Sequence, residues 1–508
     1  MAGNTAGYQT NFTGLGGTQT GGVASGVVAT PVENVEEVKA GVFGQTADFN
    51  NSTGGSVQMV TKRGTNTYHG SAYDYYFATN IGAANSWTNN HTPCNPKVQT
   101  CDLNNLNYTP RPSKHREGFG GSIGGQLTPF NSRLGKWYGF FNYEGLRFPN
   151  VGTYEHPVPS ATLREGVIEA PNSSGTYIPY NLTNAPVVVN GQTVNPSGLD
   201  PRGLGMNPVV SKIWNSQLPA GNDPNYSSGD GYNVIGFLSQ IRAPLTTNNY
   251  IGRIDHDFSE KWRFMASYRY TKLINTTTNQ VDIGGVLPGD TLGTPAAVAP
   301  RPQIDGYLVT GLTTNITSNT INDFRFAYIR QFWQWGSANA PPQVSGLGGA
   351  LELGDPLISE TTPEGTSCVN NLAPYNTNTQ CIRQRFWDGQ DKQVSDNLTM
   401  LKGDHLFQYG GTYQRNYDYH MRTDNGVGIN NQIVYWTGNY GLNNWTNSPY
   451  IPSTVPSSQY PLFENLYSEV LGIVPQTQVA YTRAGSNLTL QPVGSVAFDQ
   501  SVTPYYNV

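Results

Sequence analysis

The sequence has few charged residues and no long apolar run. Charged side chains make up 12% of its 508 residues, about half of the share usual in globular proteins. A transmembrane helix needs about 18 or more consecutive apolar residues, and no such stretch occurs. Apolar residues also show almost no 3.6-residue periodicity. The chain is therefore predicted to be built from strands rather than helices.

Basic residues are too few to suggest a nucleic-acid partner. The formal net charge is -5, and no basic stripe runs along the chain. The segment from Met1 to Thr20 is rich in Gly, Thr and Asn and lacks the basic and apolar regions of a signal peptide. For a secreted protein, we expect such a start to be truncated.

Cysteine is scarce, with four residues in two close pairs. Cys94 lies near Cys101, and Cys368 lies near Cys381. Both pairs occur in segments rich in Asn, Pro and Thr that we expect to be loops, and neither has the spacing of a zinc site. Such pairs are typical of disulfides in an oxidising compartment. Four unrelated thiols are the alternative.

Motifs of catalysis are missing as well. The sequence has no Gly-x-Ser-x-Gly elbow, His-Glu-x-x-His or phosphate-binding loop. The glycines from Gly120 to Gly125 lack the following helix of a dinucleotide site. His256 lies between Asp255 and Asp257, but neighbouring strand residues point to opposite faces. We therefore predict that the protein is not an enzyme and holds no cofactor or metal.

The abundant residues favour turns and pleated strands. Gly (58), Pro (34) and Tyr (31) are common, and aromatic residues reach 12%. The mean hydropathy of -0.45 is compatible with a membrane barrel, because such a barrel turns a polar face inward.

Strict alternation of apolar and polar residues is the main structural signal. From Trp262 to Tyr270 the even positions are Trp, Phe, Ala, Tyr and Tyr, and the odd positions are Arg, Met, Ser and Arg. This pattern predicts a strand with one apolar and one polar face. The same alternation occurs at 73–77, 250–258, 322–328 and 407–413. The predicted strands run about 10 to 15 residues, and a tilted membrane crossing needs about 9 to 11.

The predicted connections alternate between short and long. The short ones lie near 128–135, 259–260, 318–319 and 403–404. The long ones lie at about 80–115, 149–246, 276–301, 336–390 and 421–500, with possible helices at 207–217 and 464–472. Outer-membrane barrels have short periplasmic turns and long external loops, whereas a β-sandwich has no reason for this parity.

Residues 32 to 71 resemble the end of the plug domain of TonB-dependent receptors. The likeness is close at Val32 to Val38, at Gly54-Gly55-Ser56-Val57 and at Thr61 to Asn66. His69-Gly70-Ser71 is similar to the entry of the first barrel strand.

Later motifs are similar to the Oar-like group of these receptors and follow in family order along nearly the whole chain. They are Trp137 to Arg147, Gly252 to Phe258, Asp396 to Thr399 with Lys402 to His405, and Pro504 to Val508.

The resemblance implies an all-β fold and an outer-membrane location of the Gram-negative type. Residues 1–67 would be the C-terminal part of a plug domain. Residues 68–508 would be the first half of an antiparallel transmembrane β-barrel, incomplete at about 10–11 of 22 strands. The family's signal peptide, carboxypeptidase-regulatory-like sandwich, TonB box and complete plug are not visible. A half barrel leaves two open edges, so we expect it not to insert stably alone.

Three groups of residues are candidates for function. The candidate plug–barrel junction comprises Gly54, Gly55, Thr61, Lys62, Gly64, Thr65, Asn66, His69 and Gly70. Candidate lumen-facing residues are Arg253, Asp255, Asp257, Arg263 and Arg269. Candidate loop residues for stacking on sugar rings or planar chelates are Trp87, Trp387, Trp436 and Trp445, with loop packing as the alternative.

The resemblance implies energised uptake of a bulky substrate such as an oligosaccharide, a peptide or a siderophore-like chelate. The partners would be outer-membrane lipid, an unknown extracellular ligand, and the TonB complex acting through a missing N-terminal segment. An adhesion or cell-contact protein on the same barrel is the alternative. A secreted β-rich sugar-binding protein is a third hypothesis, but it leaves the alternation of short and long connections unexplained.

Overall fold

The computed structural model describes most of the chain, in segments. The described residues are 32–41, 56–78, 115–128, 135–226, 229–276, 281–283, 291–297, 300–335, 350–352, 372, 385–422, 432–435, 450–473, 476–479, 483–491 and 497–507.

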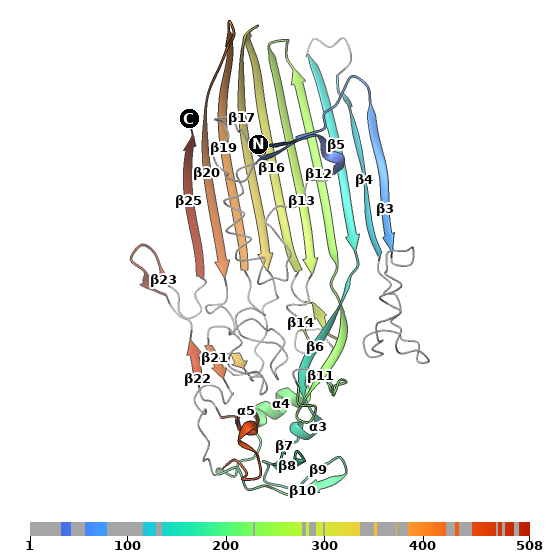
Figure 1. Ribbon diagram of the computed structural model, residues 1–508, viewed down its shortest axis with the longest axis vertical. Coiled ribbons are helices and arrows are strands. Elements are labelled where there is room, and N and C mark those ends of the chain that lie inside the picture. The colour runs from blue at the N-terminus through green and yellow to red at the C-terminus, as the bar shows by residue number, and fades with distance from the viewer. Residues whose placement is uncertain are drawn as a thin grey trace.

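One antiparallel sheet of ten strands dominates these residues (Figure 1). In chain order its strands are β3 (His69–Ala78), β4 (His115–Gln126), β5 (Lys136–Phe148), β12 (Leu245–Asp257), β13 (Trp262–Thr276), β16 (Pro300–Thr317), β17 (Thr320–Trp335), β19 (Arg385–Lys402), β20 (His405–Arg422) and β25 (Ala497–Asn507). Each strand pairs with its neighbours in sequence order, and the sheet is open, with β3 and β25 at its edges. The predicted all-β, antiparallel and incomplete barrel is confirmed.

The alternating sequence pattern explains this sheet. Residues directly opposite each other in an antiparallel pair point to the same face. Arg253 of β12 lies opposite Ser267 of β13, so the polar odd-numbered residues of both strands share one face. The apolar residues Ile254 and Ala266 share the other. A register slip of one residue would exchange the two faces.

Short turns join the strands at one end of the sheet, and long connections leave the other end (Figure 1). A two-residue turn joins β19 to β20 through Gly403, whose φ of 61° suits glycine. Bonds from Leu401 N to Asn319 O and from Asn315 N to Lys261 O, both 2.8 Å, link neighbouring turns.

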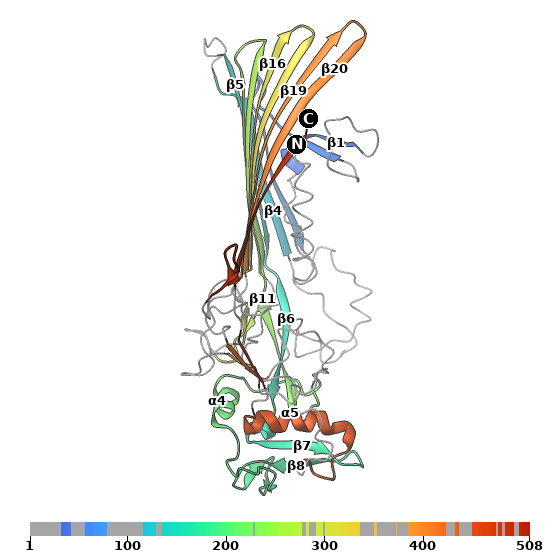
Figure 2. The same ribbon diagram turned by 90° about the vertical axis from the view of Figure 1, so that its left-hand side faces the viewer.

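A small hairpin stands off one face of the sheet (Figure 2). It consists of the 3-10 turn η1 (Val32–Asn34) and the antiparallel strands β1 (Val35–Gly41) and β2 (Ser56–Thr61). The chain runs from β2 directly into the edge strand β3.

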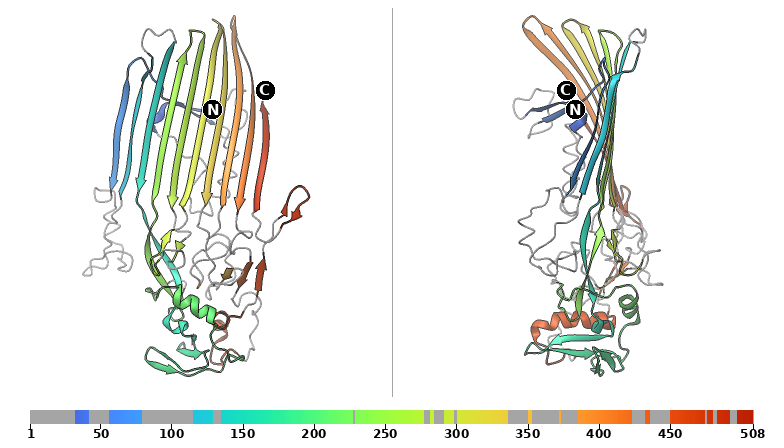
Figure 3. Two further views of the ribbon diagram at one scale, coloured as in Figure 1. Left: turned by 180° about the vertical axis from the view of Figure 1, so that it is seen from behind. Right: turned by 90° about the vertical axis from the view of Figure 1, so that its right-hand side faces the viewer.

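A second folded body lies at the end where the long connections emerge (Figures 1 and 3). Strands β6 (Val151–Pro159) and β11 (Val234–Arg242) pair with each other and prolong β5 and β12 beyond the sheet. They lead to α3 (Ala161–Arg164), β7 (Val167–Pro171), β8 (Tyr177–Asn181), β9 (Val187–Val189), β10 (Gln192–Val194) and α4 (Pro208–Ser216). With η5 (Ser457–Gln459) and α5 (Tyr460–Leu471), these elements form what we term the cap.

The cap contains the main hydrophobic core of the described residues. Trp214 and Ile213 from α4 and Leu466 and Val470 from α5 are fully buried in it. Ile283 and Leu372, which belong to two further connections, are buried in the same cluster. The connection predicted at 149–246 is thus a structured unit that gathers residues from four connections.

The two helices of the cap follow local sequence rules. Asn207 caps α4 by accepting from Val209 N at 2.9 Å, and Pro208 occupies its first turn. Gly472 ends α5 in the left-handed conformation. The helix predicted at 207–217 is confirmed. The one predicted at 464–472 begins earlier, at Tyr460, because Pro461 suits a first turn.

The remaining strands are short. They are β14 (Val281–Asp282), β15 (Ala296–Ala297), β18 (Ala350–Glu352), β21 (Gln432–Tyr435), β22 (Gln476–Val479), β23 (Arg483–Ala484) and β24 (Thr489–Leu490). No helix within the described residues is long and apolar enough to cross a membrane.

Candidate functional site

The two faces of the sheet differ in chemistry. The face on which the β1–β2 hairpin lies, termed the hairpin face, carries buried polar residues such as Asn142 and Asp255. The opposite face carries large apolar side chains in the open, including Phe141, Ile254 and Tyr268, each between 40% and 50% exposed. Only the hairpin face combines polar groups with a covering segment, so the candidate site lies there.

The five candidate lumen-facing residues all point to the hairpin face. Asp257 lies opposite Arg263 in the register, and Arg269 lies opposite Ile251, two residues from Arg253. Arg269 holds its guanidinium 4.1 Å from the centre of the Tyr307 ring.

Arg253 and Asp255 form a nearly buried ion pair. Nε of Arg253 donates to Oδ2 of Asp255 at 2.9 Å, and Nη2 donates to Oδ1 at 2.8 Å. The side chains are 10% and 7% exposed. A planar guanidinium matches a carboxylate in this two-bonded geometry, which fixes the direction of its remaining donors.

The third donor of Arg253 reaches the hairpin. Its Nη1 donates to the carbonyl oxygen of Thr61, the last residue of β2. The ion pair therefore holds the backbone of the hairpin against the middle of the sheet. Thr61 belongs to the candidate junction and Arg253 to the candidate lumen-facing group, so the fold brings the two predicted groups together.

Residues after β2 add further contacts to the sheet. Tyr138 of β5 donates its hydroxyl to Oδ1 of Asn66 at 2.9 Å, and Arg63 lies over the Tyr138 ring at 5.3 Å. Lys62 N donates to Asn34 O at 3.0 Å, and its ammonium group lies 3.6 Å from Glu33. The junction is thus tied both to the hairpin and to β5.

Gly64 marks the closest approach of this segment to the sheet. A Cβ on Gly64 would lie 2.5 Å from the carbonyl oxygens of Gly125 and Gly139, so no larger residue fits. Thr65 forms a local bond from Oγ1 to Thr67 O at 2.9 Å.

The last two candidate junction residues open β3. His69 and Gly70 pair with Gly124 and Ile123 of β4. His69 Nδ1 also lies 3.1 Å from the carbonyl oxygen of Thr67.

One contact on the hairpin face was missed by sequence reasoning. Tyr73 of β3 donates its hydroxyl to Oε2 of Glu144 of β5 at 2.8 Å. Tyr73, Tyr75 and Phe77 therefore face the hairpin side, whereas the aromatic residues of β13, such as Phe264 and Tyr268, face the opposite side. Alternation assigns residues to the two faces of a strand but does not predict which face is inside. The one sequence signal for this contact was that Glu144 and Asn142 lie two residues apart and therefore share a face of β5.

Trp387 does not lie in a loop, contrary to the prediction. It was expected in a loop at 336–390, but it lies in β19, on the hairpin face, and is 4% exposed. Its ring stacks on Trp333 at 4.2 Å and on His420 at 4.6 Å between centroids. The residues that follow Trp387 are polar on both faces of the strand. The sequence therefore lacks the alternation of apolar and polar residues that would have predicted a strand here.

The other predicted residues lie outside the described part of the chain. They are Gly54, Gly55, Trp87, Cys94, Cys101, Cys368, Cys381, Trp436 and Trp445. Within the described part, no group of three or more His, Cys, Asp or Glu side chains could hold a metal ion.

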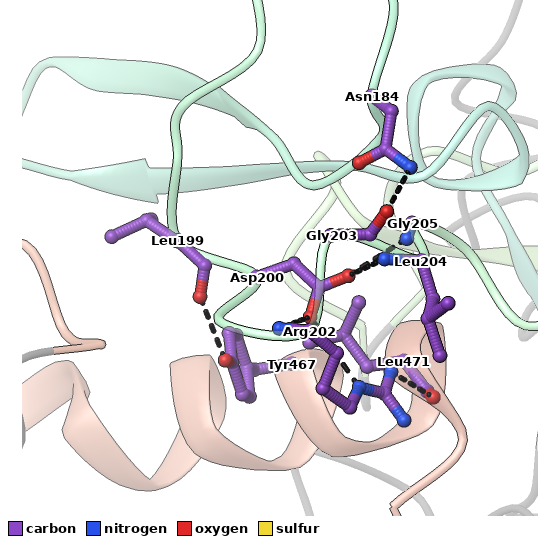
Figure 4. Close-up of polar contacts among 9 residues, drawn as sticks. All are labelled: Asn184, Leu199, Asp200, Arg202, Gly203, Leu204, Gly205, Tyr467 and Leu471. Atoms are coloured by element: carbon purple, nitrogen blue, oxygen red, sulfur yellow. Dashed lines mark hydrogen bonds and ion pairs between the residues drawn. The ribbon is translucent and has the colours of Figure 1, made fainter.

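A second polar cluster joins distant parts of the cap (Figure 4). The hydroxyl of Tyr467 donates to Leu199 O, and Nη2 of Arg202 donates to Leu471 O, both at 2.8 Å. Asp200 shapes the intervening turn by accepting from Leu204 N at 2.8 Å and from Gly205 N at 2.7 Å.

Charge and burial act together at this cluster. Burial opposes ionisation of Asp200, but the backbone donors of Gly205, Arg202 and Leu204 outweigh it and lower the pKa of its carboxyl. Burial raises the pKa of the Tyr467 hydroxyl to about 12, so it remains a donor at neutral pH. The cluster fastens α5 to the connection between β5 and β12.

Comparison with solved structures gives distant matches. The outer membrane transporter YddB from Escherichia coli is 7% identical, with a TM-score of 0.38; the match covers 80% of this chain and 37% of that one. A mutant of the ferric enterobactin receptor PfeA from Pseudomonas aeruginosa is 9% identical, with a TM-score of 0.33, covering 78% and 38%. This chain thus spans less than two fifths of either protein. No curated protein matches it.

The family comparison is broader. The model of a family described as an outer membrane beta barrel domain matches residues 60–489, which include nine of the ten strands of the sheet in full. The protein accordingly resides in the outer membrane of a Gram-negative type of cell. The chain belongs to the outer membrane beta barrel domain family.

Proposed function

We propose that this chain is part of a TonB-dependent receptor of the Oar-like group that imports a bulky solute. Residues 1–67 are the end of its plug, and residues 68–508 are the first half of its barrel. The observation that carries this proposal is the Arg253–Asp255 pair, which holds the Thr61 carbonyl on the hairpin face.

The proposed lumen explains the chemistry of the hairpin face. A barrel of about 22 strands encloses a space so wide that it needs a plug. A plug is fastened by polar contacts that can break and reform, and Arg253 and Tyr138 supply such contacts. The opposite face, with exposed Phe141, Ile254 and Tyr268, suits lipid.

Among the described residues, few hydrogen bonds fasten the hairpin to the sheet, so its release during transport requires little free energy. A hydrogen bond to a charged group contributes about 1.5–3 kcal/mol, and a neutral one about 1 kcal/mol. A force on the segment before the hairpin can therefore release it without unfolding the sheet. We propose that the TonB complex applies this force, using the proton gradient across the inner membrane.

Chemically, the substrate is an oligosaccharide, a peptide or a siderophore-like chelate. One similar structure is a ferric enterobactin receptor, which is compatible with the last of these. Trp387, stacked between Trp333 and His420, places flat ring systems near the loop end of the proposed lumen. Because both faces of the Trp387 ring are covered by these neighbours, its geometry favours packing within the wall of the proposed lumen over stacking on a sugar ring or a planar chelate.

The test is passive leakage through the intact protein in the outer membrane. Arg253→Ala removes the bond to Thr61, and losing about 2 kcal/mol shifts the balance between bound and released hairpin about thirtyfold. We expect cells that produce this variant to admit a large hydrophilic antibiotic such as vancomycin faster than wild type.

Arg325→Ala is a matched control. Arg325 also lies on the hairpin face and pairs with Asp323, two residues away, at 2.7 Å. Among the described residues, its hydrogen bond and its ion pair both go to Asp323, and neither goes to the hairpin. Equal leakage through both variants would contradict the proposed plug contact. Energised uptake is tested separately, because an uncoupler that dissipates the proton gradient should stop it.

A further inference from the structure

The opposite face of the sheet carries a positively charged patch in the half of β19 and β20 that is nearer the long connections. Lys392 of β19 lies directly opposite Arg415 of β20, and both side chains are exposed. Register places both on the same face as Tyr328, Leu308 and Tyr268. Like charges that lie directly opposite on a sheet repel each other, so this arrangement is unfavourable by itself.

Nearby carboxylates do not neutralise this pair. Asp388 is engaged by Arg330, whose Nε and Nη2 donate to its two oxygens at 2.8 Å each. In the part of the chain that the structure describes, neither Lys392 nor Arg415 lies within ion-pair distance of a carboxylate. Three cations thus face one carboxylate, and the patch is complementary to an anion.

A hollow of about 450 Å³ adjoins the two cations. It is lined by Asp388, Gln390, Lys392, Arg415, Tyr417 and Tyr419. Lys392 also holds its ammonium group 5.8 Å from the centre of the Tyr328 ring. Tyrosines that surround cations on the outside of a barrel are typical of the boundary between lipid chains and headgroups.

Strand length places the patch at that boundary. Lys402 lies at the short turn that ends β19, ten residues after Lys392 and on the same face. A tilted strand crosses the hydrocarbon layer in about 9–11 residues. If Lys402 marks one edge of the membrane, Lys392 and Arg415 lie at the other edge, and the remaining residues of β19 and β20 extend beyond it toward the long connections.

We propose that Lys392 and Arg415 bind the phosphate group of a phosphate-bearing lipid in the leaflet on the loop side. A lipid is favoured over a soluble anion because the patch lies on the apolar face, with tyrosine rings along the hollow. This inference rests on the proposed lipid-facing orientation of that face, but not on transport.

Binding can be measured with the full protein, purified in dodecyl maltoside. Phosphatidic acid, a lipid with a phosphate headgroup, is titrated into the micelles, and bound lipid is counted by native mass spectrometry. Removing one Lys or Arg near a membrane surface weakens binding of anionic lipid about fivefold, so K392Q/R415Q should bind about 25-fold more weakly. Raising the salt concentration should reduce the difference.

K402Q serves as the matched control, since it removes a Lys from the same strand and face at the other end. We expect it to bind phosphatidic acid like wild type. Equal binding by wild type and K392Q/R415Q would overturn the proposal. So would equal binding of neutral phosphatidylcholine, or displacement of the lipid by inorganic phosphate at equal concentration.

Two further readouts keep the outcomes separate. Heat-modifiable migration in gels shows that each variant is folded, so lost binding cannot be attributed to lost structure. Vancomycin leakage should be unchanged in K392Q/R415Q, because the patch does not contact the hairpin. If the plug proposal failed, the lipid-binding result would still stand. If lipid binding failed, the plug proposal would still stand.

Discussion

The sheet and the cap stabilise the same chain in different ways. In the sheet, large apolar residues such as Tyr268 (49% exposed) and Trp262 (45% exposed) lie in the open. In the cap, Trp214 and Leu466 are completely buried. The sheet relies on continuous backbone pairing and on a lipid environment for its apolar face, whereas the cap relies on a hydrophobic core of its own.

The two regions also differ in the order in which their segments meet along the chain. Each strand of the sheet pairs with strands that are its neighbours in sequence order. The cap packs α4 against α5, more than 200 residues later in the chain. The alternating pattern therefore predicts the strands of the sheet, although β5 and β12 pair across the long connection that forms the cap. No such pattern predicts which connections meet in the cap.

The largest expected effect is that of Trp214→Ala. Replacing a buried Trp by Ala costs about 3–5 kcal/mol, and the variant also loses the 3.0 Å bond from Nε1 to Leu372 O. Hydrogen exchange in residues 151–242 should accelerate strongly, while the strands of the sheet keep their protection. Trp262→Ala, on the exposed face, is the control and should change exchange by less than about 1 kcal/mol. If both variants accelerated hydrogen exchange to a similar extent, the proposed difference between the cap and the sheet would be wrong.

A smaller effect is expected when arginines of the two regions are compared. Arg164 donates to the carbonyl oxygens of Pro159, Leu218 and Pro219 at 3.1, 3.1 and 2.7 Å. Arg164→Met leaves these acceptors without their donor, at a cost of about 2 kcal/mol in cap stability. Arg330, 49% exposed beside Asp388, should matter less, at about 0–1 kcal/mol for Arg330→Met. A larger loss for Arg330→Met, measured by hydrogen exchange, would contradict this ranking.

Arg164 should also be insensitive to pH in the ordinary range. Burial lowers its pKa to about 10, below the unfolded value of about 12.5. The folded and unfolded forms are both charged below pH 10, so the effect of Arg164→Met should stay constant between pH 6 and 9. The contribution of Arg164 to the stability of the cap would rise with pH only above about pH 10, the pKa of Arg164 in the folded state.

The smallest expected effect on the stability of the cap is that of a substitution at Asp200. Asp200→Asn should cost the cap about 1–2 kcal/mol at neutral pH, because a neutral amide is a weaker acceptor for the donors of Leu204 and Gly205. The folded pKa of Asp200 is lowered, so its contribution is present above the unfolded pKa of about 3.9 and is lost as pH falls through the folded value. Proteolysis between α5 and β22 should reveal this loss. A difference that persists below about pH 2 would contradict it.

Sequence reasoning was strongest where the periodicity was regular. The run from Trp262 to Tyr270 predicted β13 and both of its faces, and the residues around Arg253 predicted β12. It was weaker at Trp387, since the loop end of β19 has polar residues on both faces. From the sequence, we could predict only that the junction residues and the lumen-facing residues lie close together. The particular hydrogen bond between Arg253 and Thr61 could not be predicted.

By itself, the sequence determined the strands, their alternation and the all-β architecture, because a period of two residues fixes the two faces of a strand locally. Only the tertiary structure decided that Tyr73 faces Glu144 and that Arg253 holds the hairpin. It also decided that α5 joins α4 in one core. These features depend on which distant segments meet, and no local pattern records that.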